Sequence, residues 1–164
     1  MTYKRKSRSQ SYRKCCDTCT CKTKKIKIKF GEFEKPVFPW NYKEGCRKSK
    51  VLYFVFCCIC RRDLKIHTLY VGNCKEKIKT RFSHARSRVR NFSKQPDFNS
   101  KQYTRLDLHF IEEHPEAELD KNIEIALISG VIENDKERSR IETTTKNELK
   151  LKTKHMENVK VLNR

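Results

Sequence analysis

The chain has 164 residues and a formal net charge of +19, from 39 lysines and arginines against 20 aspartates and glutamates. Its basic excess lies in residues 1–100, which hold 27 basic and 7 acidic side chains, whereas residues 101–164 hold 12 and 13. A positive excess of this size repels itself and is typical of proteins that bind a polyanion. We therefore expect nucleic acid to contact the first hundred residues; the alternative is a solvated, highly charged surface.

The same composition disfavours a membrane-embedded or secreted protein. The longest apolar run, Val51 to Ile59, is far shorter than the roughly 20 residues of a membrane-spanning helix. The chain is charged from Lys4 onward and lacks the apolar stretch of a secretory signal. We expect an intracellular protein without a membrane partner, and the basic run of Lys4–Lys6 and Arg8 is compatible with nuclear import.

Nine cysteines lie in the basic part of the chain, at positions 15, 16, 19, 21, 46, 57, 58, 60 and 74. In an intracellular protein they indicate metal binding or free thiols rather than disulfides. Cys57 and Cys60 have the C-x-x-C spacing that brings two thiolates to one Zn²⁺ from a tight turn, which is half of a tetrahedral site. The alternative is a set of small buried side chains, because free cysteine packs well in cores. The candidates to complete the site are Cys19, Cys21, Cys46 and His67.

Three regions follow one another along the chain. Residues 1–14 have almost nothing to bury, and we expect them to form a disordered basic arm. Residues 15–50 form a Cys-rich extension that we expect zinc to support, and within it Lys25–Phe30 alternates apolar and basic side chains as a half-buried strand does. Residues 51–164 carry the stronger strand and helix patterns and form the main domain.

Two strands and the connection between them are predicted to form a hairpin at the start of the main domain. Val51–Phe56 is a continuous apolar run of β-forming residues, whose length suits a buried strand. Ile66–Val71 is the second strand, and we expect Gly72 to end it and to allow a sharp turn into the next helix.

Three helices and a third strand are predicted after the hairpin, in the order β-β-α-α-β-α. Lys75–Arg90 places four apolar residues on one helical face. The remaining predicted elements are a helix over Tyr103–Glu113, a strand over Asn122–Ile128 and a helix over Asp135–Thr153. The first of the three helices is strongly basic, and its residues expected to contact nucleic acid are Lys79, Arg86, Arg88 and Arg90.

Four residues of these elements are candidates for one catalytic site. Tyr53 and Tyr70 lie on adjacent strands and can project from the same face. Arg81 follows on the basic helix, where a guanidinium group could bind a phosphate through two donors. Glu142 on the last helix could hold Mg²⁺, which keeps most of its waters and takes other ligands from phosphate. Taken singly, each has an ordinary alternative as a core tyrosine, a solvated arginine or a helix-surface glutamate.

Together these segments resemble the GIY-YIG nuclease domain carried by Penelope-like retroelements. Lys50–Cys60 resembles the strand that carries the GIY tyrosine in those elements and that ends in C-x-x-C. Leu69–Gly72 is similar to the YIG half. Ile78–Arg86 resembles the helix that follows, with its catalytic arginine at Arg81.

The second half of the chain resembles the family through shorter motifs. Leu106–His114 is similar to the next helix, which in the family ends in a histidine-containing turn. Ile141-Glu142 and Val161–Asn163 resemble the last helix and the closing asparagine. The cysteines at positions 15–21 and 46 match the thiol-rich stretch that precedes the domain in those elements.

The resemblance implies an α/β sandwich, with a three-stranded antiparallel sheet flanked by helices and a Cys-rich N-terminal extension. It implies a metal-dependent endonuclease that cleaves DNA strands, with RNA as the alternative substrate. In that reaction Tyr53 or Tyr70 would help to deprotonate the attacking water and Arg81 would hold the scissile phosphate. The resemblance assigns further roles to Glu142 (Mg²⁺ or Mn²⁺ ligand), His84 (proton transfer) and Asn163 (fastening of the last segment).

Two alternatives remain open within this interpretation. Glu148 is a rival to Glu142 as the metal ligand, because its distance along the chain from Asn163 fits the family better, whereas the residues around Glu142 fit the local motif better. The chain can also be a catalytically inactive, zinc-bearing nucleic-acid-binding protein that keeps the scaffold and the basic face. The last helix lacks the tryptophan that usually follows the glutamate in the family, which favours this second interpretation.

Overall fold

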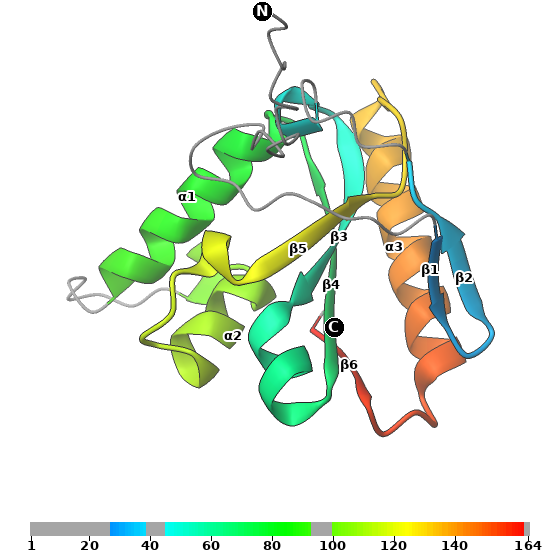
Figure 1. Cartoon of the computed structure of the whole chain (residues 1–164). Coiled ribbons are helices and arrows are strands. Elements are labelled where there is room, and N and C mark those ends of the chain that lie inside the picture. Colours follow the sequence, from blue (N-terminus) through cyan, green and yellow to red (C-terminus); the bar gives the residue numbers. More distant parts are fainter. Residues whose placement is uncertain (1–26, 39–44, 93–99, 163–164) are drawn as a thin grey trace, which may run out of the picture.

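The computed structural model describes residues 27–38, 45–92 and 100–162 (Figure 1). Its strands are β1 (Lys27–Phe30), β2 (Phe33–Pro36), β3 (Val51–Cys57), β4 (His67–Cys74), β5 (Ile123–Leu127) and β6 (Val159–Val161). Its helices are α1 (Ile78–Asn91), α2 (Arg105–Glu113) and α3 (Asp135–Thr153). Short helical turns are η1 (Gly45–Arg47), η2 (Cys60–Leu64), η4 (Ser100–Gln102) and η5 (Leu119–Lys121).

The main sheet has four strands in the order β5-β3-β4-β6. β3 pairs antiparallel with both β4 and β5, as the predicted hairpin requires, whereas β6 runs parallel to β4. The expectation of a three-stranded antiparallel sheet was therefore wrong, because Val159–Val161 adds a fourth strand and β1 and β2 form a separate two-stranded sheet. A strand of three residues is too short to show an alternating pattern, which is why the sequence did not predict β6.

Both faces of the main sheet are covered, and this explains the continuous apolar run of β3. Side chains alternate across a strand, so Tyr53 and Val55 face one core while Phe54 and Phe56 face the other. Figure 1 shows α1 and α2 on one side of the sheet and α3 with the β1–β2 hairpin on the other. The arrangement is a two-sided α/β sandwich, and all seven residues of β3 are buried.

The hairpin of β1 and β2 belongs to the predicted Cys-rich extension, yet it packs on the main sheet. Phe30 lies 6.5 Å from Phe56 and Phe33 lies 5.8 Å from Phe54, measured between ring centroids. The strand predicted over Lys25–Phe30 is present as β1, but the sequence did not predict its partner β2. The basic arm of residues 1–14 and the cysteines at positions 15–21 lie outside the described residues.

Candidate active site and metal centre

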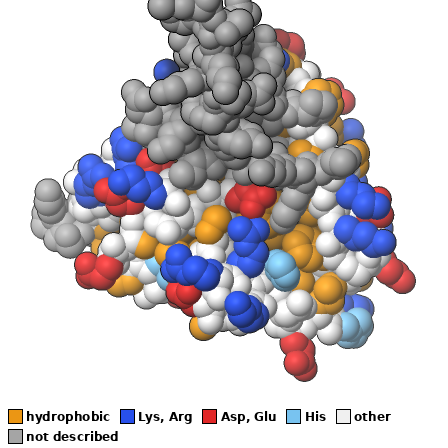
Figure 2. Space-filling view, viewed as in Figure 1, with side chains coloured by type: hydrophobic (Ala, Val, Ile, Leu, Met, Phe, Trp, Pro, Cys, Tyr) orange, Lys and Arg blue, Asp and Glu red, His pale blue; other side chains and the backbone are white. Residues whose placement is uncertain are grey.

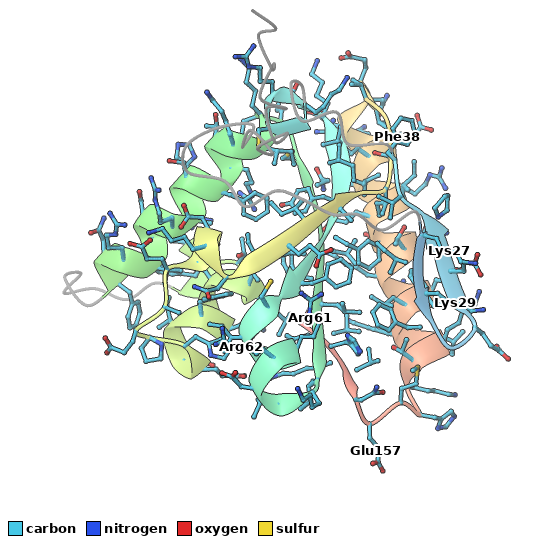
Figure 3. The ribbon with its side chains drawn as sticks, viewed as in Figure 1. Lys27, Lys29, Phe38, Arg61, Arg62 and Glu157 are labelled. Atoms are coloured by element: carbon cyan, nitrogen blue, oxygen red, sulfur yellow. The ribbon has the colours of Figure 1, made fainter. Side chains whose placement is uncertain are left out.

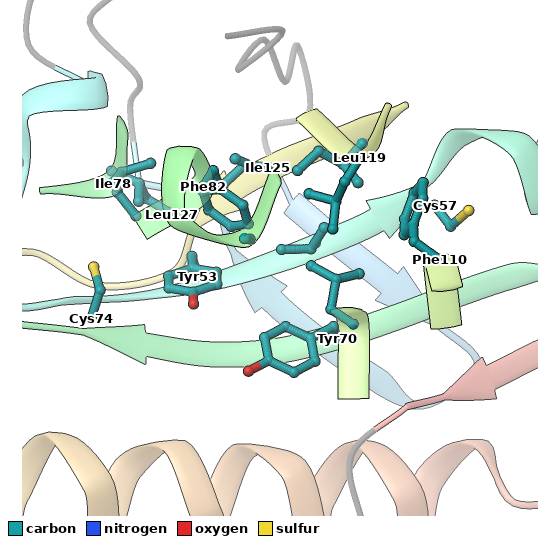
Figure 4. Packing of buried hydrophobic residues seen from close by; sticks show 14 of the residues in the cluster. Tyr53, Cys57, Tyr70, Cys74, Ile78, Phe82, Phe110, Leu119, Ile125 and Leu127 are labelled. Carbon is teal, nitrogen blue, oxygen red and sulfur yellow. The ribbon is translucent and has the colours of Figure 1, made fainter. Parts of the chain in front are cut away.

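Tyr53 and Tyr70 lie together on the face of the sheet that α1 covers. Their ring centroids are 6.4 Å apart, and the ring of Phe82 from α1 packs edge-on against Tyr53 at 5.4 Å. Figure 4 shows the phenol oxygen of Tyr53 directed away from Phe82. Tyr53 is 1% exposed and Tyr70 is 8% exposed. Tyr70 is therefore the more accessible of the two phenols.

Gly72 separates these tyrosines, and β4 continues through it to Cys74, so the predicted strand end at this glycine was wrong. A Cβ atom on Gly72 would lie 2.7 Å from the Tyr53 hydroxyl and 2.8 Å from the Tyr70 ring. Only a glycine leaves room for both rings at this point of the strand. Its purpose here is close packing rather than a turn.

Arg81 lies at the start of α1 and hydrogen-bonds to both tyrosine side chains. Burial raises the pKa of Tyr53 well above its ordinary value, and Tyr70 adds to this effect, while the charge of Arg81 opposes it. Burial likewise raises the pKa of Tyr70, again against Arg81. Both phenols are therefore neutral at physiological pH and able to donate a hydrogen bond.

Glu142 of α3 approaches the same point from the other side of β4. Its carboxylate accepts a hydrogen bond from the Asn73 side chain and pairs with the Lys146 ammonium group. The negative charge of Glu142 acts on the phenol of Tyr70 and contributes to its raised pKa, after burial. β6 pairs only with the first three residues of β4, so in the described part of the chain the edge from Tyr70 onward has no strand partner.

The rival ligand Glu148 has a different environment on the same helix. It pairs with Lys35 of β2 at 3.1 Å and with Lys152 at 3.0 Å. These two ammonium groups lower the pKa of its carboxyl group, first through the hydrogen bond from Lys152. The charge of Glu142 thus acts on Tyr70, whereas Glu148 pairs with lysines of β2 and α3.

The other residues expected at the active site are less well placed or lie outside the described residues. His84 follows Arg81 along α1, but its side chain is exposed to solvent while the tyrosines are buried. The neighbouring Ala85 occupies the buried position on that turn. Asn163 lies outside the described residues.

Three of the four basic residues expected to bind nucleic acid are ion-paired within the fold. The partners of the guanidinium groups lie on α2 and in the segment between α2 and β5, and Lys79 is exposed to solvent. Figure 2 shows lysine and arginine side chains beside aspartates and glutamates over the visible face. Contact of these arginines with phosphate stays a prediction. The pairs are Arg86 with Asp120 at 3.0 Å, Arg88 with Asp107 at 2.8 Å and Arg90 with Glu118 at 3.3 Å.

A second cluster of chemically reactive side chains lies where β3 ends. Cys57, Cys60, His109 and His114 place one ligand atom each within 4.8 Å of one another. The first three of these residues are buried and His114 is half-buried. Two thiols and two imidazoles are the ligand set of a Cys₂His₂ zinc site, so this cluster could hold a metal ion.

The distances within the cluster match the edges of a zinc tetrahedron. The Cys60 sulfur lies 3.4 Å from Nε2 of His109 and 3.2 Å from Nε2 of His114. The Cys57 sulfur lies 3.6 Å from Nε2 of His114. Zinc bonds of about 2.3 Å to sulfur and about 2.0 Å to nitrogen place such atoms roughly 3.6 Å apart in tetrahedral geometry.

The surroundings of the cluster also suit a metal. Burial raises the pKa of Cys57 to about 12, so its thiol is protonated without a metal, and a bound cation would stabilise the thiolate. The other ring nitrogen of His109 lies 3.3 Å from the Glu113 carboxylate, which pairs with Lys160 of β6 at 2.6 Å. A carboxylate behind a histidine ligand fixes its ring and raises its basicity.

The π-helical turn η2 positions the second cysteine of the motif. It begins at Cys60 and ends at Leu64, and the left-handed backbone of the following Lys65 (φ 57°) reverses the chain toward β4. Arg61 projects from this turn (Figure 3) and pairs with Glu124 of β5 at 2.9 Å. This ion pair ties the turn to the sheet beside the metal ligands.

The predicted ligand pair of Cys57 and Cys60 thus lies in a cluster that could hold a metal ion, but the expected partners are not those in the cluster. Cys46 is buried in the core, and His67 packs against Phe30 with centroids 5.2 Å apart. Cys19 and Cys21 lie outside the described residues. The signal that the sequence analysis missed is the H-x₄-H spacing of His109 and His114, which is the usual second half of a Cys₂His₂ site.

No protein-family model, curated protein or solved structure matches this chain. Within the described ranges, no helix combines the length and apolar character needed to cross a lipid bilayer. Function has to be inferred from the two clusters, one around Tyr70 and one around Cys60.

Proposed function

We propose that this chain is a metal-dependent endonuclease of the GIY-YIG type, with DNA as its substrate. The observation that carries the proposal is that Tyr53 and Tyr70 pack beside Gly72, with Arg81 hydrogen-bonded to both phenols and the charge of Glu142 acting on Tyr70. These side chains come from four separate elements, β3, β4, α1 and α3. Their order along the chain is also the order in which the family resemblance places them.

Phosphodiester cleavage needs an activated water, compensation of developing negative charge and support for the leaving oxygen. Arg81 supplies a fixed positive charge with several donors, which suits the scissile phosphate. Tyr70 is better placed than Tyr53 to contact water, because it is the more exposed phenol. As a neutral phenol, it would orient the attacking water by a hydrogen bond, and the proton released from that water would pass to a phosphate oxygen or to solvent.

Glu142 is the residue that would hold a Mg²⁺ or Mn²⁺ ion. Its carboxylate suits this role, since one oxygen already faces a cationic group, the Lys146 ammonium, and the other is held by the Asn73 amide. When bound, such an ion stabilises negative charge on the leaving 3′ oxygen. We assign the second metal, a structural Zn²⁺, to the cluster of Cys57, Cys60, His109 and His114, where all four ligands come from the protein.

A nicking assay on supercoiled plasmid tests the nuclease proposal. We expect the parent protein to nick DNA with Mg²⁺ and the Glu142→Gln variant to lose several orders of magnitude in rate, since metal stabilisation contributes several kcal/mol and about 1.36 kcal/mol is tenfold. Glu148→Gln is the matched control on the same helix and should retain the activity. Loss of activity in Glu148→Gln alone would move the metal site to that residue.

Absence of nicking by the parent protein would contradict the nuclease proposal. DNA binding measured on the same samples then decides what remains. For such binding, log K should fall with log[salt] with a slope of about −0.9 for each phosphate contact. This salt dependence without any cleavage would support the inactive, zinc-bearing binding protein instead.

A further inference from the structure

The Glu142 carboxylate has two contacts of different character. Asn73 donates its side-chain amide to Oε2, and the Lys146 ammonium pairs with Oε1. Lys146 follows Glu142 by one turn of α3. The two oxygens that a metal ion could approach are thus both engaged, one by a neutral donor and one by a cation.

The orientation of the Asn73 side chain is fixed by Arg138. Arg138 is 3% exposed and donates to the Asn73 amide oxygen at 3.0 Å, to the Ile132 carbonyl at 2.9 Å and to Asp135 at 2.7 Å. Arginine has no acceptor, so the amide oxygen of Asn73 must face Arg138 and its NH₂ group must face Glu142. Oε2 therefore has a fixed donor.

The contact with Lys146 is exchangeable. Its side chain is 22% exposed and joins Glu142 across one helical turn, at the i,i+4 spacing. Such pairs contribute little to stability, and the long side chain can turn into solvent. A divalent ion at Oε1 would repel the ammonium group strongly at contact distance. The two cations cannot occupy this oxygen together.

We propose that Lys146 is an internal competitor for the divalent cation that Glu142 would hold. The inference rests on the proposed function, because that function makes Glu142 the metal ligand. Before metal binds, Lys146 compensates a carboxylate that is only 14% exposed. A divalent ion has to displace it from Oε1 while Asn73 keeps Oε2, so Lys146 lowers the affinity for the metal.

The test is an NMR titration of the zinc-loaded full chain with Mg²⁺ at constant ionic strength, followed at the Asn73 side-chain amide. We expect Lys146→Met to lower the half-saturating Mg²⁺ concentration by about threefold to fivefold, from the usual strength of such ion pairs. Lys146→Gln should act in the same direction. Lys152→Met removes the equivalent i,i+4 partner of Glu148 on the same helix and should leave the titration unchanged.

An unchanged or higher half-saturating concentration in both Lys146 variants would overturn the inference. A Mg²⁺ response that survives in Glu142→Gln would overturn it together with the metal assignment. If the parent protein nicks no DNA but the Lys146 variants bind Mg²⁺ more tightly, the nuclease proposal fails and the competition stands. The titration does not depend on activity, so the two failures are distinguishable.

Discussion

Tyr53 of the tyrosine cluster and Cys57 of the Cys/His cluster lie on one face of β3, and the two clusters differ in how complete they are. Tyr53 and Cys57 are four residues apart on β3, roughly 13 Å at about 3.3 Å per residue. Figure 4 shows Cys57 near Phe110, at the opposite end of the β3–β4 pair from Cys74. One cluster supplies four protein ligands, which is typical of a structural metal, whereas the other supplies one carboxylate and leaves positions for substrate.

Under the proposed function, this difference separates stability from catalysis. The closed cluster is the Cys/His cluster of Cys57, Cys60, His109 and His114. It joins β3 and η2 to α2. The open cluster is the tyrosine cluster of Tyr53, Tyr70, Arg81 and Glu142. It joins β4, α1 and α3 through hydrogen bonds that a phosphate could replace. Changes at the first should destabilise the protein, and changes at the second should leave a stable protein that does not cleave.

The largest effect is expected from removal of the zinc ligands. Cys57→Ser with Cys60→Ser should remove about one zinc per chain, because metal binding is coupled to folding. Each kcal/mol lost from the free energy of unfolding lowers the Tm by about 2–4 °C in a chain of this size. A loss of several kcal/mol therefore lowers the Tm by on the order of 10 °C or more. Zinc content and thermal melting measure both effects.

Cys58→Ser is the control for that experiment, since Cys58 lies between the two ligands and outside the cluster. It should keep the zinc and nearly all of the stability. Equal zinc content in the double variant and the parent would show that the cluster holds no metal.

The next effect concerns Arg81, in the open cluster. Arg81→Lys keeps the positive charge but loses the planar fork that binds two phosphate oxygens. We expect cleavage to fall by about 10²- to 10³-fold, as on loss of other transition-state donors, with the Tm almost unchanged. Arg90→Lys, on the exposed end of the same helix, is the control. If Arg81→Lys lowers the Tm as well as the rate of cleavage, Arg81 has a structural role instead.

A smaller effect is expected at Gly72, where the tyrosine cluster depends on close packing. Gly72→Ala places a methyl group against Tyr53 and Tyr70, and overpacking of this kind costs about 1–3 kcal/mol. Chemical denaturation and nicking should both be affected, because the two rings have to move. In Gly130→Ala the nearest atom is 3.3 Å away at the tip of the Phe38 ring, which is half exposed, so that change should be nearly neutral.

The sequence predicted the elements whose signals are local. The apolar run of β3, the pattern of α1 and the bounds of α3 follow from residues close in the chain, and the tyrosine pair follows from the hairpin. The strand β6 was missed because three residues carry no pattern. The sequence predicts a turn at Gly72, because close packing of a glycine by two rings depends on tertiary structure and leaves no local signal.

The two clusters differ in the same way. The order of Tyr53, Tyr70 and Arg81 along the chain was enough to predict that they lie close together. The sequence left Glu142 and Glu148 as alternative metal ligands, and only their neighbours in space distinguish them. For zinc, the C-x-x-C half was evident, but His109 lies 49 residues after Cys60. Cysteines nearer in the chain were therefore chosen as partners, although only folding brings α2 to the end of β3.

The smallest expected effect tests the residue behind the zinc ligands. Glu113 lies 3.3 Å from His109 and is itself paired with Lys160, so Glu113→Gln removes the negative charge that orients the imidazole and keeps the side-chain shape. Loss of such a partner weakens metal binding by about 10- to 100-fold, and competition with a chromogenic chelator measures it. Glu112→Gln, the exposed neighbour on α2, should bind zinc as the parent does. With saturating zinc, Glu113→Gln should cleave DNA at the rate of the parent, because the Glu113 charge acts on the closed cluster alone. A loss of cleavage with zinc still bound would show that the two clusters are coupled through β3.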